Sequence, residues 1–250
     1  MTVDAAVDVP FDSPLAWVPR FATVVFDVDS TLSTIEGIDW LAMRRSHEIA
    51  RACATLTEQA MAGAVPLDAV YGQRLALIRP TAQEIALLGE AYLATMVPGM
   101  RSLIRLLLIK RVQVHLLSGG LRQALLPLAR HLGIGERQVH AVEVAADVDG
   151  TLSRLEGKQP LATQRGKPQT VHQLAAARPL VMIGDGSTDA AARGVVDTFI
   201  AFTGVVRRPA VVEVADAEAA SVRALHRLLF EPDHAHELFT AFSNDPAGGD

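Results

Sequence analysis

The stretch TVVFDVDST at residues 23–31 decides the fold of this 250-residue chain. It joins an apolar run of strand length to a polar turn with two acids, Asp27 and Asp29. Two later stretches repeat this arrangement: VQVHLL at 112–117 leads into Ser118, and LVMI at 180–183 leads into Gly184 and Asp185. Such runs, most of them followed by helical patterns, are typical of a parallel α/β sheet.

Residues from about 34 to 96 form a separate region, because their pattern is helical throughout and contains no strand-like run. The segment TAQEIALLGEAYLATM at 81–96 begins with a Thr-x-x-Glu capping box. We therefore expect a small helical cap inserted into the core. The predicted parts are an N-terminal extension at 1–20, a core at 21–33 and 97–235, the cap at 34–96 and a C-terminal tail at 236–250.

Composition limits the classes of partner and the compartment. The chain has 23 basic and 28 acidic residues and a formal net charge of -5, so it lacks the basic surface that a nucleic acid requires. The single cysteine, Cys53, excludes an internal disulfide and fits a reducing compartment. The start MTVDAAVDVP has no basic leader, and no apolar run reaches membrane-spanning length. We expect a cytoplasmic enzyme that binds no membrane; no feature predicts its oligomeric state.

Polar residues that follow the three runs should meet, because the carboxyl ends of parallel strands share one edge of the sheet. They include acids that would repel one another, a hydroxyl group and Gly-rich backbone donors. Together with a downstream lysine, this set makes sense if Mg²⁺ and a phosphoryl group share the site. The residues are Asp27, Asp29, Ser118, Gly119, Gly120, Asp185 and Asp189.

The spacing of Asp27 and Asp29 suits a two-step phosphoryl transfer, because side chains at i and i+2 of an extended segment point the same way. One carboxylate can act as the nucleophile. The other can protonate the leaving oxygen and then activate water.

Five motifs in this order resemble those of phosphoserine phosphatases of the haloacid dehalogenase-like superfamily: DVDST, EGID, LSGG, GK and GDGSTD. The segment AMAGAVPLDAVYGQRLALIRPT at 60–81 is similar to the cap of the animal-type enzymes. The resemblance covers about residues 22 to 215. It implies a Rossmann-like core with a small helical cap, a requirement for Mg²⁺, and hydrolysis of O-phospho-L-serine in serine biosynthesis.

Residue roles follow from the resemblance, motif by motif. Asp27 corresponds to the nucleophile and Asp29 to the general acid/base, whose carbonyl also faces the metal. Asp185 completes the set of metal ligands. Asp189 would orient Lys167 and the metal-binding residues without binding the metal itself. Ser118, the Gly119 amide and Lys167 would hold the transferring phosphoryl oxygens. In the cap, Glu36 would bind the serine ammonium and Arg74 its carboxylate, while Met61 and Thr188 would line the same pocket.

Departures from the family pattern leave the fine specificity open. Leu67 and Leu121 stand where aromatic residues are usual, and Pro168 follows the lysine. The same chemistry on another small phosphate monoester, such as phosphohomoserine, is one alternative. A non-enzymatic phospho-acceptor module is another, although such modules lack an inserted lid.

The second DVDxT pattern, DVDGT at 147–151, is predicted to be a β-hairpin turn.

Overall fold

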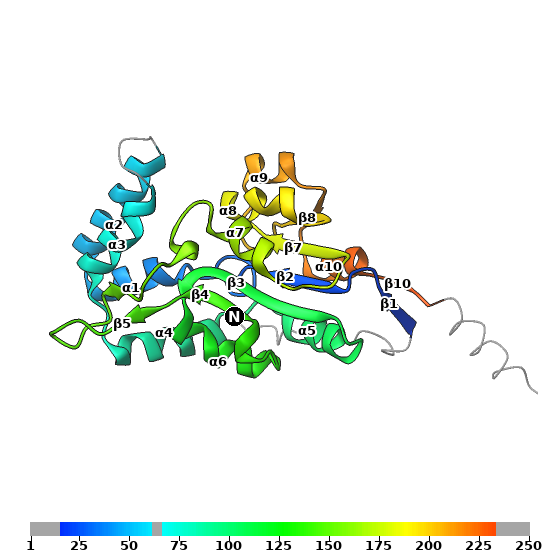
Figure 1. Cartoon of the computed structure of the whole chain (residues 1–250), viewed down its shortest axis with the longest axis horizontal. Coiled ribbons are helices and arrows are strands. Elements are labelled where there is room, and N and C mark those ends of the chain that lie inside the picture. Colours follow the sequence, from blue (N-terminus) through cyan, green and yellow to red (C-terminus); the bar gives the residue numbers. More distant parts are fainter. Residues whose placement is uncertain (1–15, 62–66, 234–250) are drawn as a thin grey trace, which may run out of the picture.

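A six-stranded parallel sheet forms the centre of the computed structural model, which describes residues 16–61 and 67–233 (Figure 1). Its central strands are the three that the sequence predicts: β2 (Thr23–Phe26) lies between β3 (Gln113–Leu121) and β7 (Leu180–Gly184). On the β3 side, β4 (Val139–Val142) forms the edge. On the β7 side follow β8 (Thr198–Phe202) and β9 (Ala217–Ala219). The predicted α/β class with a Rossmann-like parallel core is confirmed.

Helices cover both faces of the sheet, which explains why β2 and β7 are buried along their whole length and consist almost entirely of apolar residues. On one face lie α5 (Met100–Ile109), α6 (Arg122–Leu132) and α10 (Val222–Leu229). On the other lie α7 (Gly166–Gln173), α8 (Ser187–Ala190) and α9 (Pro209–Val214) (Figure 1). Along β2, Val24 and Phe26 pack into the first layer and Val25 into the second.

The described part of the inserted region consists of four helices between β2 and α5. They are α1 (Gly37–Arg45), α2 (His47–Met61), α3 (Leu67–Ile78) and α4 (Ala82–Ala94). The predicted capping box begins α4: the Glu84 amide donates to Thr81 Oγ1 at 3.2 Å, and the Thr81 amide donates to the Glu84 carboxylate at 2.8 Å. Figure 1 shows α2 and α3 standing upright as a pair, whereas α4 packs on the core helix α6. The division into cap and core residues stays a prediction.

A hairpin formed by β5 (Val144–Ala145) and β6 (Arg154–Leu155) contains the second DVDxT pattern, as predicted. Gly150 takes the left-handed conformation in its turn, with φ +80. The hairpin also contacts the inserted region. The Leu152 amide donates to the Pro80 carbonyl at 2.7 Å, and Arg79 forms an ion pair with Asp149. It is therefore a connection between the core and the helical insertion.

The two ends of the described chain lie together. Strand β1 (Trp17–Pro19) pairs antiparallel with β10 (Phe230–Pro232), so the last part of the expected N-terminal extension joins the folded body. The rest of that extension and the expected C-terminal tail lie outside the described residues. Three short 3-10 turns complete the described elements: Glu136–Gln138, Pro160–Ala162 and Ala191–Val195. None of the described helices is long and apolar enough to cross a bilayer.

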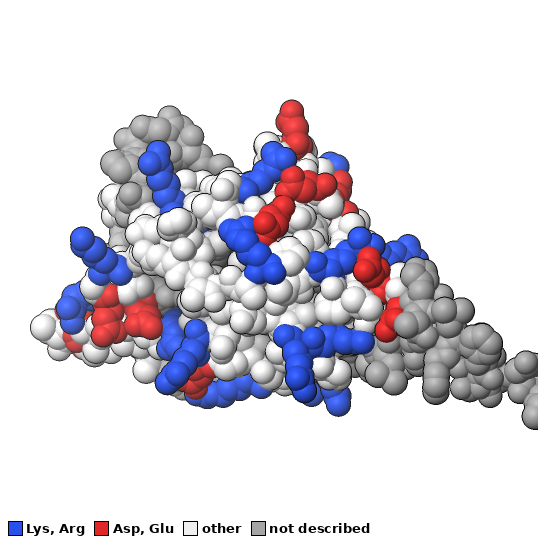
Figure 2. All heavy atoms as spheres, turned by 45° about the vertical axis from the view of Figure 1, so that its right-hand side comes forward, with Lys and Arg blue, Asp and Glu red and all other residues white. Residues whose placement is uncertain are grey.

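Basic and acidic side chains are scattered over the face shown in Figure 2, its middle included, and groups of opposite sign often adjoin. The described residues include exposed ion pairs, such as Arg130–Glu136 at 2.7 Å and Arg207–Glu218 at 2.9 Å. Pairs this exposed contribute little to stability, because water and salt screen them. The buried layers therefore account for most of the stability.

Two substitutions on α6 test this difference. Leu125 is fully buried, so Leu125→Ala should lower the free energy of unfolding by about 2–5 kcal/mol. Arg130 has an exposed ion pair, so Arg130→Ala should change it by less than about 1 kcal/mol. Urea denaturation of both variants measures the two values; equal losses would contradict the assignment of stability to the buried layer.

Candidate active site

The polar residues at the carboxyl ends of the central strands line one cavity of about 720 Å³. Asp27 follows β2 and Asp185 follows β7, while Ser118 lies in the last part of β3. The pairing of β3 with β4 shifts between Leu117 and Leu121, so the chain is irregular at the SGG segment. There the Gly120 amide donates to Ser118 Oγ at 2.9 Å.

Lys167 lies between two carboxylates that line this cavity. Its Nζ donates to Asp27 Oδ1 at 2.6 Å and to Asp189 Oδ1 at 2.5 Å, and all three side chains are buried. The lysine is in the first turn of α7, which begins at Gly166; a Cβ there would collide with the Pro160 carbonyl. Burial lowers the pKa of Lys167, but the two carboxylates outweigh it and raise the pKa overall. The side chain is therefore a fixed cation.

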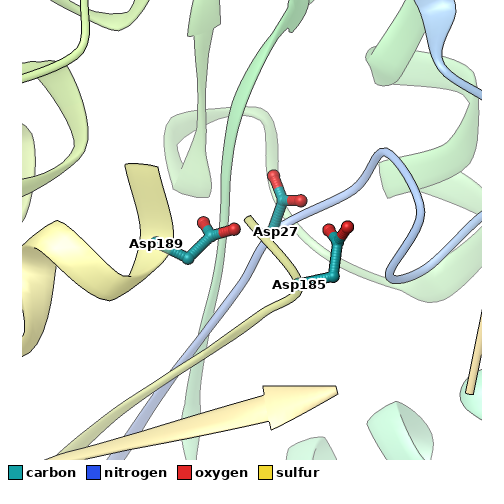
Figure 3. A group of neighbouring side chains, drawn as sticks. All are labelled: Asp27, Asp185 and Asp189. Atoms are coloured by element: carbon teal, nitrogen blue, oxygen red, sulfur yellow. The ribbon is translucent and has the colours of Figure 1, made fainter. Parts of the chain in front are cut away.

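Three buried carboxylates, those of Asp27, Asp185 and Asp189, lie close together (Figure 3). One oxygen from each lies within 4.8 Å of the others. Thr31 donates to Asp185 Oδ1 at 3.2 Å, and the Gly186 amide donates to Asp189 Oδ2 at 2.9 Å. Burial, followed by the charge of Asp27, raises the pKa of Asp189 to about 7.

This arrangement fits a divalent cation. Carboxylate oxygens are the ligands that hard cations such as Mg²⁺ and Ca²⁺ prefer. A bound cation stabilises closely spaced carboxylates most, because it offsets the repulsion between their charges. Arg208 already places a guanidinium against Asp185 Oδ2, so the corner attracts positive charge. The Asp29 carboxyl is not part of this group.

Asp29 also lines this cavity, and its carboxyl group accepts hydrogen bonds from two donors. Tyr92 donates from its hydroxyl to Asp29 Oδ1 at 2.6 Å, and the Gly37 amide donates to Oδ2 at 3.2 Å. Burial, then the charges of Glu36 and Asp27, raises the pKa of Asp29 to about 8. A carboxyl that keeps its proton at neutral pH is suited to protonating a leaving oxygen.

The inserted helices contribute the opposite side of the cavity. Glu36 precedes α1 and accepts a hydrogen bond from Ser30 at 2.7 Å, and Arg74 on α3 forms an ion pair with Asp39. Thr188 also lines the cavity, from α8. The expected contact residue Met61 ends α2, and its side chain lies outside the described residues.

The structure brings together every other predicted site residue and adds some that sequence reasoning missed. Arg208 reaches both Asp185 and Glu36, the latter at 3.6 Å. It comes from FTGVVRRP at 202–209, which carries no motif that would single it out. Tyr92 lies in the helical pattern of α4, where an aromatic residue reads as core, and Tyr71 of α3 lines the cavity.

Two of the three unusual residues lie in described parts of the core. Leu121 is fully buried and packs among the apolar residues of the sheet. Pro168 occupies the first turn of α7, where a helix needs no amide donor and tolerates proline. The side chain of Leu67 lies outside the described residues.

Comparisons with known proteins agree with this geometry. Residues 24–192 match the family model of the haloacid dehalogenase-like hydrolases. The phosphoserine phosphatase of Bos taurus is 37% identical over 196 residues, covering 77% of this chain and 86% of that protein. The human phosphoserine phosphatase is 37% identical over 188 residues, covering 74% and 83%. The structure of a phosphoserine phosphohydrolase-like protein from Francisella tularensis has a TM-score of 0.72 at 25% identity, covering 82% of this chain and 98% of the other. The chain therefore belongs to the haloacid dehalogenase-like hydrolases, in the branch that contains the phosphoserine phosphatases, and is a phosphatase.

Proposed function

We propose that this enzyme hydrolyses O-phospho-L-serine to L-serine and phosphate in serine biosynthesis, with Mg²⁺ as its metal. One observation carries the proposal: the cavity that holds Asp27 beside Lys167 is also lined, from the inserted helices, by Glu36 and Arg74. A phosphate-transferring end and an amino-acid-binding end thus share one space. The relatives named phosphoserine phosphatases support the substrate. A cytoplasmic location stays a prediction from the sequence.

In the first transfer, a carboxylate oxygen of Asp27 attacks phosphorus and forms an acyl phosphate. The bond between phosphorus and the seryl oxygen breaks, and this oxygen takes the proton of Asp29. Protonation matters because an alkoxide is a poor leaving group. Serine then leaves with its hydroxyl restored.

In the second transfer, Asp29 works in the opposite direction. Its carboxylate takes a proton from water, whose oxygen attacks the phosphorus of the acyl phosphate. The bond from phosphorus to Asp27 breaks, and the nucleophile returns to its carboxylate form. Inorganic phosphate leaves, and Asp29 holds the proton that the next cycle requires.

The remaining groups hold the phosphoryl oxygens. Lys167, Ser118 and Gly119 line the same cavity as Asp27. The lysine, the Ser118 hydroxyl and the Gly119 amide would donate to the phosphoryl oxygens, and preorganised donors stabilise charge that develops in the transition state. Asp27, Asp185 and the Asp29 carbonyl would hold Mg²⁺, with Asp189 behind them. When bound, the ion would supply positive charge that stabilises the negative charge of the phosphoryl oxygens.

Selection of the amino acid depends on the inserted helices. Glu36 would pair with the ammonium group of the substrate and Arg74 with its carboxylate, for which a planar guanidinium is suited. Arg74 already pairs with a carboxylate, that of Asp39, in this structure. Met61 and Thr188 would complete the lining.

Phosphate release from a panel of substrates tests the proposal. With Mg²⁺, O-phospho-L-serine should give the highest kcat/KM among phosphoserine, phosphothreonine, phosphohomoserine and sugar phosphates. Chelation of the metal should remove this activity, and Asp27→Asn should serve as the inactive blank. A higher kcat/KM for another member of the panel would overturn the substrate while leaving the chemistry in place.

Arg74→Ala tests whether Arg74 binds the carboxylate group of the substrate. It should raise KM for phosphoserine by about two orders of magnitude, because the substrate carboxylate loses a paired charge. Hydrolysis of p-nitrophenyl phosphate, which has no carboxylate, should change by less than about twofold. Arg51→Ala is the control, since Arg51 lies exposed on α2 and away from the cavity. Equal losses of activity on both substrates would argue against binding of the substrate carboxylate by Arg74.

A further inference from the structure

Tyr92 connects the inserted helices with the carboxyl group of Asp29. Its side chain is fully buried on α4, and its hydroxyl donates to Asp29 Oδ1 at 2.6 Å across 63 residues of sequence. The other carboxyl oxygen accepts from the Gly37 amide at 3.2 Å. One donor comes from each end of the insertion, so both oxygens of Asp29 are held from this region.

Two glycines leave the space through which the phenol reaches Asp29. A Cβ at Gly37 would collide with the Tyr92 hydroxyl. A Cβ at Gly120 would lie 3.2 Å from the same hydroxyl and 3.1 Å from Ser118 Oγ. The hydroxyl thus sits where α1 begins, beside the SGG segment. Tyr92 therefore contacts Asp29 and lies beside the SGG segment, but it is not among the residues that line the cavity.

Packing alone does not account for the hydroxyl. A phenylalanine would fill the same apolar space on α4, whereas a buried hydroxyl is costly unless it is hydrogen-bonded. Its hydrogen bond is to a carboxyl that lines the cavity beside Asp27. Hydrogen bonds to charged or acidic groups are the stronger ones, and they fix orientation.

We propose that Tyr92 is a positioning residue that holds the Asp29 carboxyl toward the leaving oxygen of the substrate. The inference rests on the role of Asp29 given under the proposed function. Tyr92 does not touch the reacting atoms; it acts through Asp29. Its loss should impair the transfer that needs a proton and spare one that does not.

The test compares the first turnover of two substrates in the magnesium-loaded Tyr92→Phe variant. Release of serine from phosphoserine needs a proton on the leaving oxygen, whereas p-nitrophenol leaves readily as its anion. Tyr92→Phe should slow the first release of serine about 10- to 100-fold, the range for a misplaced general acid, with KM changed less than about twofold. The burst of p-nitrophenol should keep its wild-type rate within about twofold.

Thr95→Val is the matched control, because it removes a hydroxyl one turn along the same segment. Thr95 Oγ1 contacts Ser33 and the Ala91 carbonyl, at 2.7 Å each, and does not reach Asp29. This variant should keep both first-turnover rates, and thermal unfolding of both variants shows how much stability each loses. Equal slowing of both substrates in Tyr92→Phe, or slowing of neither, would overturn the inference.

A wrong substrate assignment can be distinguished from a wrong role for Tyr92. Wild-type turnover of phosphoserine tests the substrate alone. If the wild type prefers another alkyl phosphate of the panel, that compound replaces phosphoserine in the comparison, and the same difference between alkyl and aryl leaving groups decides the role of Tyr92.

Discussion

The crowding of three buried carboxylates at one edge of the sheet is the constraint on which the site depends. Asp27, Asp185 and Asp189 cannot all remain charged in a buried space without positive charge between them. Lys167 supplies one cation, at 2.6 Å and 2.5 Å from two of them. The third carboxylate contacts Arg208. The same demand for positive charge attracts a divalent cation to this corner.

The insertion is part of the site rather than only a cover. Glu36 and Arg74 line the cavity from one side, while Tyr92 and the Gly37 amide hold Asp29 from another. A movement of these helices would therefore change the surroundings of Asp29 as well as access to the cavity. The hairpin at 144–155 is a second connection, since it contacts Pro80 through the Leu152 amide.

Much of the fold was predictable because its signals are local. Strands β2 and β7 begin and end close to the predicted runs, since each is an apolar segment followed by a polar turn. Strand β3 contains Gln113 and His115 and continues past the predicted end at Leu117 to Leu121. The position of Asp27 and Asp185 follows from parallel topology alone. The DVDGT hairpin was predictable from Asp-Gly, and Gly150 indeed takes a positive φ.

What could not be predicted depends on tertiary packing. Arg208 reaches Asp185 from a loop that follows another strand, and nothing in its neighbours marks it. Tyr92 looks like a core residue on an amphipathic helix, and only the fold places its hydroxyl against Asp29. The pairing of Arg74 with Asp39 is likewise a contact between two helices of the insertion. Periodicity shows which face of a helix is buried, but not which atom it meets.

The proposed reaction requires that the Asp27 carboxyl becomes phosphorylated during turnover. Mass spectrometry of acid-quenched enzyme, taken while it hydrolyses its substrate, tests this most directly. A phosphoryl group should be found on the peptide that contains Asp27 and should be absent from the Asp27→Asn variant. Turnover at the wild-type rate by Asp27→Asn, with no adduct on the working enzyme, would contradict it.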